Sequence, residues 1–228
     1  MTPPNAELLR SLGKLARGLS ALFWGLPASL IVCAETARIE LLKPIGIVPA
    51  LVVNALLLFG LWQMGDFQKQ ERPWRNALDR AKIFGLVNLG LTPFLYWQNK
   101  MPEQPFFDMA VLALALSAIF FLFNLNVVLK QLGAMLPDET LRQETRQFTA
   151  LNRWLLLVWM FSSVLFLFFV PACFPDLPAR FGQKYWAWIV RGEVAVLLFL
   201  GLAPLAMTMA LIWKTKETIL DSVFGPRQ

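Results

Sequence analysis

Apolar and polar stretches alternate along this chain with the spacing of membrane-spanning helices. Residues 109–128, MAVLALALSAIFFLFNLNVV, contain no charged side chain. Because each helical residue rises about 1.5 Å, these residues cover the roughly 30 Å hydrocarbon core of a bilayer. Five other stretches approach the same description, and the pattern predicts spans at residues 19–34, 45–64, 81–98, 109–128, 155–173 and 194–213.

Polar, amphipathic segments lie before or between these spans, at residues 5–18, 66–80 and 137–153. In the first, leucines recur on one helical face, at Leu8, Leu12, Leu15 and Leu19. This predicts either a helix lying on the membrane surface or a plain extension of the first span. In the third, Leu141, Thr145 and Phe148 fall on one helical face, and Leu151 and Leu155 follow where the helix is expected to enter the membrane.

The expected fold is therefore an all-α, polytopic membrane bundle of six transmembrane helices, a single domain over residues 1–228 with short cytoplasmic amphipathic extensions. The first span also has features of a signal peptide, with a basic start and Val32-Cys33-Ala34 at a cleavage-like position. The long region before its apolar core, which includes Glu7, favours an uncleaved anchor.

Composition agrees with lipid as the main solvent. Hydrophobic residues make up 57% of the 228 residues and charged residues 16%, whereas soluble domains average roughly 45–50% and 25%. The net charge of +6 would suggest nucleic acid for a soluble protein. Here the basic residues flank apolar spans, so topology and anionic lipid explain them, and no nucleic-acid partner is expected.

Lysine and arginine also predict the orientation. With the amino terminus inside, the inner segments contain fifteen of the 21 basic residues. This bias places both termini in the cytoplasm. Two termini on the same side require an even number of spans, which favours six over five or seven. Tryptophans fall at the predicted span ends, as expected for interfacial belts: Trp62, Trp154 and Trp213 inside, and Trp97, Trp186 and Trp188 outside. The expected location is a bacterial cytoplasmic (inner) membrane.

Catalytic chemistry has little support in the residue types. The chain has no histidine and two cysteines, which removes the commonest general base and the commonest metal ligand. No nucleophile–base pair, phosphate loop or metal-ligand spacing is present. We expect no catalytic residues, no metal and no cofactor.

Four asparagines are the candidate intramembrane polar site: Asn54, Asn88, Asn124 and Asn126. An amide facing lipid would leave its donors and acceptors unsatisfied, so these side chains should face protein or water. They would either line a polar path or join helices by hydrogen bonds.

Two further groups fall at the predicted outer rim. Glu35, Arg38, Arg191 and Glu193 are a candidate ion-pair cluster if the first and sixth helices are neighbours. Cys33 and Cys173 are at matching outer ends and are candidates for a disulfide, since that side of a bacterial membrane is oxidising. Alternatively, the four charged residues lie at span ends, where their side chains reach the interface. The two cysteines would then be small apolar side chains that pack between helices.

The sequence leaves three function classes open. The first is a non-catalytic integral membrane subunit or scaffold, whose partners are the lipid bilayer and other membrane subunits or further copies of itself. The second is a small-solute or ion transporter with a polar path near Asn54, Asn88 and Asn124. The third is a lipid-modifying membrane enzyme, which would need carboxylates such as Glu35 and Glu193 to converge.

Overall fold

The computed structural model describes residues 3–38, 45–68, 70–101, 103–136, 139–164 and 183–224. Every regular element within these ranges is an α-helix: α1 (Pro3–Arg38), α2 (Val48–Met64), α3 (Arg72–Leu91), α4 (Pro93–Lys100), α5 (Pro105–Met135), α6 (Glu139–Val164) and α9 (Gln183–Phe224). The expected all-α class is confirmed for this part of the chain.

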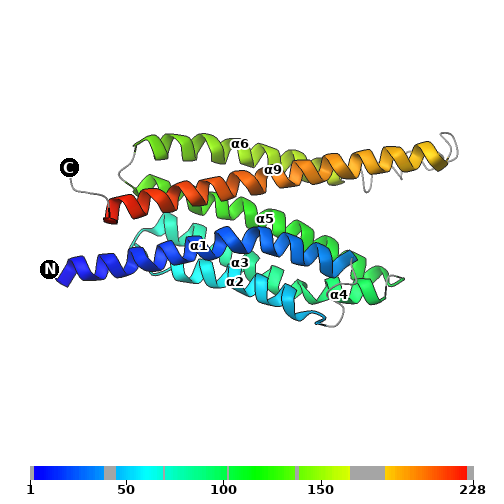
Figure 1. Cartoon of the computed structure of the whole chain (residues 1–228), viewed down its shortest axis with the longest axis horizontal. Coiled ribbons are helices and arrows are strands. Elements are labelled where there is room, and N and C mark those ends of the chain that lie inside the picture. Colours follow the sequence, from blue (N-terminus) through cyan, green and yellow to red (C-terminus); the bar gives the residue numbers. More distant parts are fainter. Residues whose placement is uncertain are drawn as a thin grey trace.

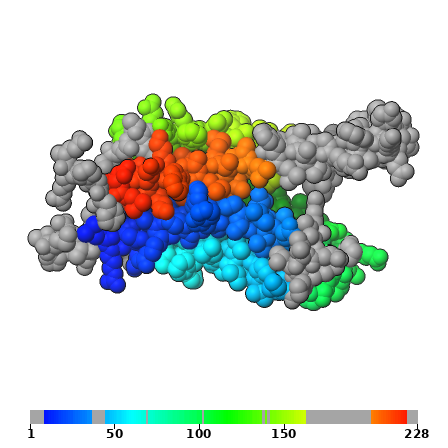
Figure 2. All heavy atoms as spheres, in the orientation of Figure 1, coloured from blue at the N-terminus to red at the C-terminus, as the bar shows by residue number. Residues whose placement is uncertain are grey.

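The helices lie lengthwise against one another as a bundle (Figure 1). Helix α1 packs against α2 and α9, α5 packs against α3 and α6, and α6 packs against α9. The start of α1 and the end of α9 lie at the same end of the bundle, which we call the terminal end (Figure 1). Figure 2 shows α1 and α9 side by side along one face, with α2 beside α1.

Two described stretches are long and apolar enough to cross a membrane, Leu9–Thr36 within α1 and Pro105–Met135, which is α5. Helix α2 is also apolar but has 17 residues. Prolines fix the starts of several helices, because a proline in the first turn loses no intrahelical hydrogen bond. These prolines are Pro49, Pro73, Pro93 and Pro105.

Helix α1 is continuous through the first polar segment and the first expected span. Leu15 and Leu19 are fully buried against the bundle, so this leucine face contacts protein. Of the two alternatives for residues 5–18, the structure favours a plain extension of the helix over a separate surface helix.

The third expected span is divided into two helices, α3 and α4. Pro93 has no N–H to donate to the carbonyl one turn earlier, and its ring clashes with that carbonyl. Helix α3 therefore ends at Leu91, and the Thr92 N–H still donates to the Asn88 carbonyl at 2.9 Å. The sequence predicts one continuous span through this position because the residues on both sides of it are apolar.

The main core is a continuous cluster of leucines and aromatic residues from five helices. It includes Leu19 and Leu22 of α1, Leu61 of α2, and Leu125 and Leu129 of α5. Residues of α3 and α9 complete it, among them Trp74, Leu78, Leu211 and Ile212. The described part of α6 contributes no residue to this cluster, which sets α6 apart from its neighbours.

Helix α6 buries polar side chains and exposes apolar ones. Thr145, Thr149 and Asn152 are buried, and with Leu156 they follow one helical face. On the other side, Phe148, Leu151, Trp154, Leu157, Val158 and Phe161 are exposed. The residues that the sequence groups on one face of residues 137–153 are divided in the structure: Thr145 is buried, whereas Phe148 and Leu151 are exposed.

Candidate functional site

Three helices meet at a hydrogen-bonded cluster of Asn126 (α5), Asn152 (α6) and Thr208 (α9). The Asn152 amide nitrogen donates to Asn126 Oδ1 at 3.0 Å and to Thr208 Oγ1 at 2.9 Å. The Asn126 amide nitrogen donates to Thr208 Oγ1 at 3.0 Å. All three side chains are at least 97% buried, so this core cluster joins α5, α6 and α9 away from any solvent.

A proline helps to complete this core cluster. The Pro204 carbonyl accepts from the Thr208 hydroxyl at 2.7 Å and from the Asn152 amide at 3.2 Å. One acceptor is left over: Asn152 Oδ1 is buried and has no hydrogen-bond partner among the described residues, and the same holds for Thr149 Oγ1 one turn away. The amide and hydroxyl donors of Asn126, Asn152 and Thr208 therefore all have acceptors, whereas the Asn152 side-chain oxygen has no donor within the described residues.

A second cluster lies where α1, α2 and the α3–α4 break come together. The Asn54 amide nitrogen donates to Thr92 Oγ1 at 3.1 Å and to the Ala50 carbonyl at 3.0 Å, and it lies 3.7 Å from Cys33 Sγ. The Thr92 hydroxyl in turn donates to the Asn88 carbonyl at 2.6 Å. These contacts hold α2 against the break between α3 and α4.

Asn88 enters this second cluster through its backbone, while its side-chain oxygen is buried and unpaired within the described residues. Ser117 Oγ of α5 is in the same condition. Gly85 of α3 lies against the Phe121 ring of α5, and Asn88 and Ser117 are each one turn from that contact in the same direction along the bundle. The two orphaned oxygens are therefore at matching heights on neighbouring helices.

The four predicted asparagines thus do not form one site. Asn126 belongs to the core cluster and Asn54 and Asn88 to the second cluster. Asn124 is partly exposed, and its amide nitrogen donates to the Phe120 carbonyl of its own helix at 2.8 Å. Hydrogen bonding between helices accounts for Asn54 and Asn126, whereas Asn124 faces outward from α5.

The predicted outer-rim cluster falls largely outside the described side chains. Glu35 is half-buried, and its Oε2 is buried without a partner in the described part of the chain. The side chains of Arg38, Arg191 and Glu193 are not among those described, so the ion-pair cluster stays a prediction. The disulfide between Cys33 and Cys173 also stays a prediction, since Cys173 lies outside the described residues.

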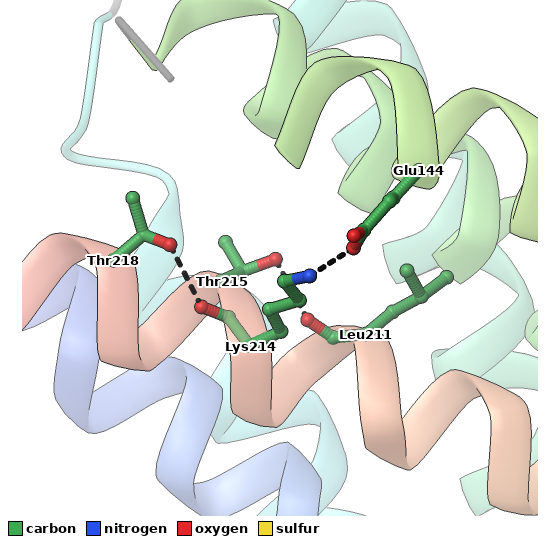
Figure 3. Close-up of polar contacts among 5 residues, drawn as sticks. All are labelled: Glu144, Leu211, Lys214, Thr215 and Thr218. Carbon is green, nitrogen blue, oxygen red and sulfur yellow. Dashed lines mark hydrogen bonds and ion pairs between the residues drawn. The ribbon is translucent and has the colours of Figure 1, made fainter. Parts of the chain in front are cut away.

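Two ion pairs between segments lie toward the terminal end. Lys214 of α9 pairs with Glu144 of α6, while the hydroxyls of Thr215 and Thr218 donate to carbonyls of α9 itself (Figure 3). Lys14 of α1 pairs with Asp66 in the turn after α2. These two pairs connect α1 to the turn after α2 and α9 to α6.

Sequence reasoning missed Asn152 and Thr208. Asn152 lies in a segment assigned to the cytoplasm, and Thr208 lies within the expected span at residues 194–213, where the sequence singles out no polar residue. A signal was present: Thr145, Thr149 and Asn152 recur at the spacing of one helical face. Read as an inward polar face in lipid, this pattern would have placed Asn152 in the core.

The described residues contain no group of three or more acidic, cysteine or histidine side chains that could hold a metal ion. The arrangement provides amide, hydroxyl and carbonyl groups, which bind water, small polar solutes or one another. Comparison with protein-family models, with curated proteins and with solved structures finds no match.

Proposed function

We propose that this chain is a non-catalytic integral membrane subunit or scaffold of a larger membrane assembly. In this proposal it spans a bacterial inner membrane six times, with both termini in the cytoplasm. One observation carries the membrane placement: α6 buries Thr145, Thr149 and Asn152 while Trp154 and Phe161 are 68% and 69% exposed. Water would favour the opposite arrangement, whereas lipid favours this one.

Other helices support the same placement. Val52, Phe59 and Trp62 of α2 are exposed while Asn54 is buried. Ile83 and Leu86 of α3 are exposed while Asn88 is buried. Lipid favours an apolar surface around a core that contains the amides, because an amide that faces hydrocarbon has no hydrogen-bond partner there.

A structural role is supported by how the polar groups are used. Asn126, Asn152 and Thr208 donate to one another or to backbone, and so they hold helices together. The exposed apolar face of α6 is available to lipid or to a partner helix, as van der Waals packing drives association in bilayers. The partners in this proposal are other membrane subunits or further copies of the chain.

Extraction in a mild detergent, followed by affinity capture with mass spectrometry and by size exclusion with light scattering, tests the role. The expected result is a complex heavier than the 25.9 kDa chain, containing defined partner subunits or several copies. A stable lone monomer from native membranes would contradict the subunit role. Protein that stays monodisperse without detergent would contradict the membrane placement itself.

Topology has its own test. A single cysteine introduced at Glu103, between α4 and α5, should react with an impermeant maleimide added to intact cells. A cysteine at Arg10, near the start of α1, should react only after permeabilisation. Both variants are built with Cys33 and Cys173 replaced by serine. The reverse pattern would contradict the proposed orientation.

One observation favours a second candidate, a small-solute or ion transporter. Asn88 Oδ1 and Ser117 Oγ are buried at matching heights without partners among the described residues, so a water or polar solute between α3 and α5 could donate to both. Substituting Asn88 by leucine should abolish uptake while preserving folding if this candidate is correct. If folding and uptake are both unchanged, the result favours the structural role.

A further inference from the structure

Helices α5 and α6 run antiparallel, and their residues pair at regular intervals along the contact. Asn126 bonds to Asn152, and Gly133 lies against Thr145. At the surface of the protein, beside this contact, the Arg153 guanidinium lies over the Phe123 ring, 5.0 Å from its centroid. Arg153 is exposed and Phe123 is half-buried, so this contact marks a surface seam between α5 and α6.

Cations gather along this seam. Lys130 is two turns after Phe123 on α5, and Arg146 is two turns before Arg153 on α6, so helical periodicity places both on the same side as the cation–ring contact. Lys130, Arg146 and Arg153 are all exposed. We call these three residues and Phe123 the basic seam.

The nearby carboxylates of α6 are engaged elsewhere. Glu139 pairs with Arg142 at 3.2 Å, and Glu144 pairs with Lys214 of α9. No described carboxylate pairs with Lys130, Arg146 or Arg153. The basic seam therefore presents three positive charges that the described part of the protein does not neutralise.

Toward the middle of the bundle the same surface becomes apolar. Leu157 and Phe161 follow Arg153 on α6 by one and two turns, and Phe120 precedes Phe123 on α5. All three are exposed. Trp154, beside Arg153, is 68% exposed, and under the proposed membrane placement this indole ring lies at the interfacial level together with the cations. Positive charge at this level and apolar side chains beyond it match the two parts of a phospholipid.

We infer that the basic seam binds the phosphate-bearing headgroup of an anionic phospholipid, with an acyl chain lying along Phe120, Leu157 and Phe161. This inference rests on the proposed membrane placement. Arginine suits the role because its planar fork donates two hydrogen bonds to a phosphate. Charge complementarity favours a lipid with net negative charge over a zwitterionic one.

The test uses the full chain in nanodiscs or detergent, with phosphatidylglycerol and phosphatidylcholine as probes. The seam variant replaces Lys130, Arg146 and Arg153 by glutamine. The matched control replaces Arg10, Arg17 and Lys216 by glutamine, which removes the same charge from α1 and α9. Native mass spectrometry counts retained lipids, and titration of labelled phosphatidylglycerol gives relative affinities.

The expected result is selective retention of phosphatidylglycerol by the wild type and the control variant, with binding weakened about fivefold for each cation removed from the seam. Equal loss in the seam and control variants would overturn the inference, since it would indicate a diffuse charge effect. Competition by inorganic phosphate alone would assign the seam to a soluble anion. Displacement of a co-purified polypeptide by the seam variant would assign it to a protein partner.

Failure of this inference is distinguishable from failure of the membrane placement. A chain that needs detergent yet retains no phosphatidylglycerol in preference to phosphatidylcholine contradicts the lipid site alone. Circular dichroism of both triple variants shows whether they fold. If the triple seam variant does not fold, the single substitution Arg146→Gln, which removes no aromatic contact, gives the affinity comparison.

Discussion

Gly18 of α1 and Gly60 of α2 meet backbone to backbone: a Cβ added to Gly18 would lie 2.6 Å from the Gly60 carbonyl oxygen. Small residues at such crossings let two helices approach closely, which strengthens van der Waals packing in the absence of a hydrophobic driving force. Two turns further along α1, Gly25 lies against the side chain of Leu57.

Gly18→Ala should destabilise the protein although alanine is the better helix former. The displaced neighbour is backbone, so α1 and α2 must separate, at about 1–3 kcal/mol, against a gain of about 1 kcal/mol in helix propensity. Gly13→Ala is the matched control, because nothing lies within 4 Å of a Cβ there. Thermal unfolding in detergent should show a lower midpoint for the first and an equal or higher one for the second.

Asn152→Leu should lower stability by about 1–2 kcal/mol, because it removes the hydrogen bonds from α6 to Asn126, Thr208 and the Pro204 carbonyl. Hydrogen bonds between helices average roughly 0.6 kcal/mol each in membranes. Asn124→Leu, which removes only a bond within α5, should be close to neutral. The measurement is denaturation monitored by circular dichroism. Combining Asn126→Leu with Asn152→Leu should cost less than the sum of the single changes, and strict additivity would show that the two asparagines act independently.

Lys214→Glu should weaken the α6–α9 contact by no more than about 1 kcal/mol, because both partners are about 40% exposed. The double variant Lys214→Glu with Glu144→Lys should restore stability. Raising the salt concentration should shrink the difference between wild type and the single variant, since screening acts on exposed pairs. No recovery in the charge-swapped protein would show that the pair is incidental.

Phe161→Lys should interfere with membrane integration, at about 2.5–3.5 kcal/mol for a charge near the centre of a span. Phe148→Lys is the control: it is also exposed on α6 but lies toward the terminal end, where a lysine reaches the interface. The measured quantity is the fraction of chain that cofractionates with membranes. A gain of solubility for Phe161→Lys would place this face in water.

The helices themselves follow from the sequence because long apolar runs and proline starts are local signals. Met109 to Val128 falls within α5, and Pro105 begins that helix. Which face of α6 turns toward the core could not be predicted in the same way. Its charges and its threonines occupy different faces, and only the solvent decides which of them turns inward.

The asparagines show the same division. The sequence predicts that Asn54 and Asn126 face protein or water, because an amide facing lipid would be costly, and both side chains are buried in the structure. Their separation into two clusters depends on helix neighbours: α2 meets the α3–α4 break, whereas α5 meets α6 and α9. Those contacts join residues far apart in the chain, such as Asn126 and Thr208, which no local pattern encodes.

The core cluster also constrains how the protein is made. Thr208 emerges from the ribosome 56 residues after Asn152, so α6 is synthesised long before its last hydrogen-bond acceptor exists. Under the proposed placement, the nascent helix has to shelter Thr145, Thr149 and Asn152 against α5 or within the insertion machinery until α9 arrives. A ribosome stalled before Pro204 would therefore hold α6 in an immature state that quality-control proteases can recognise.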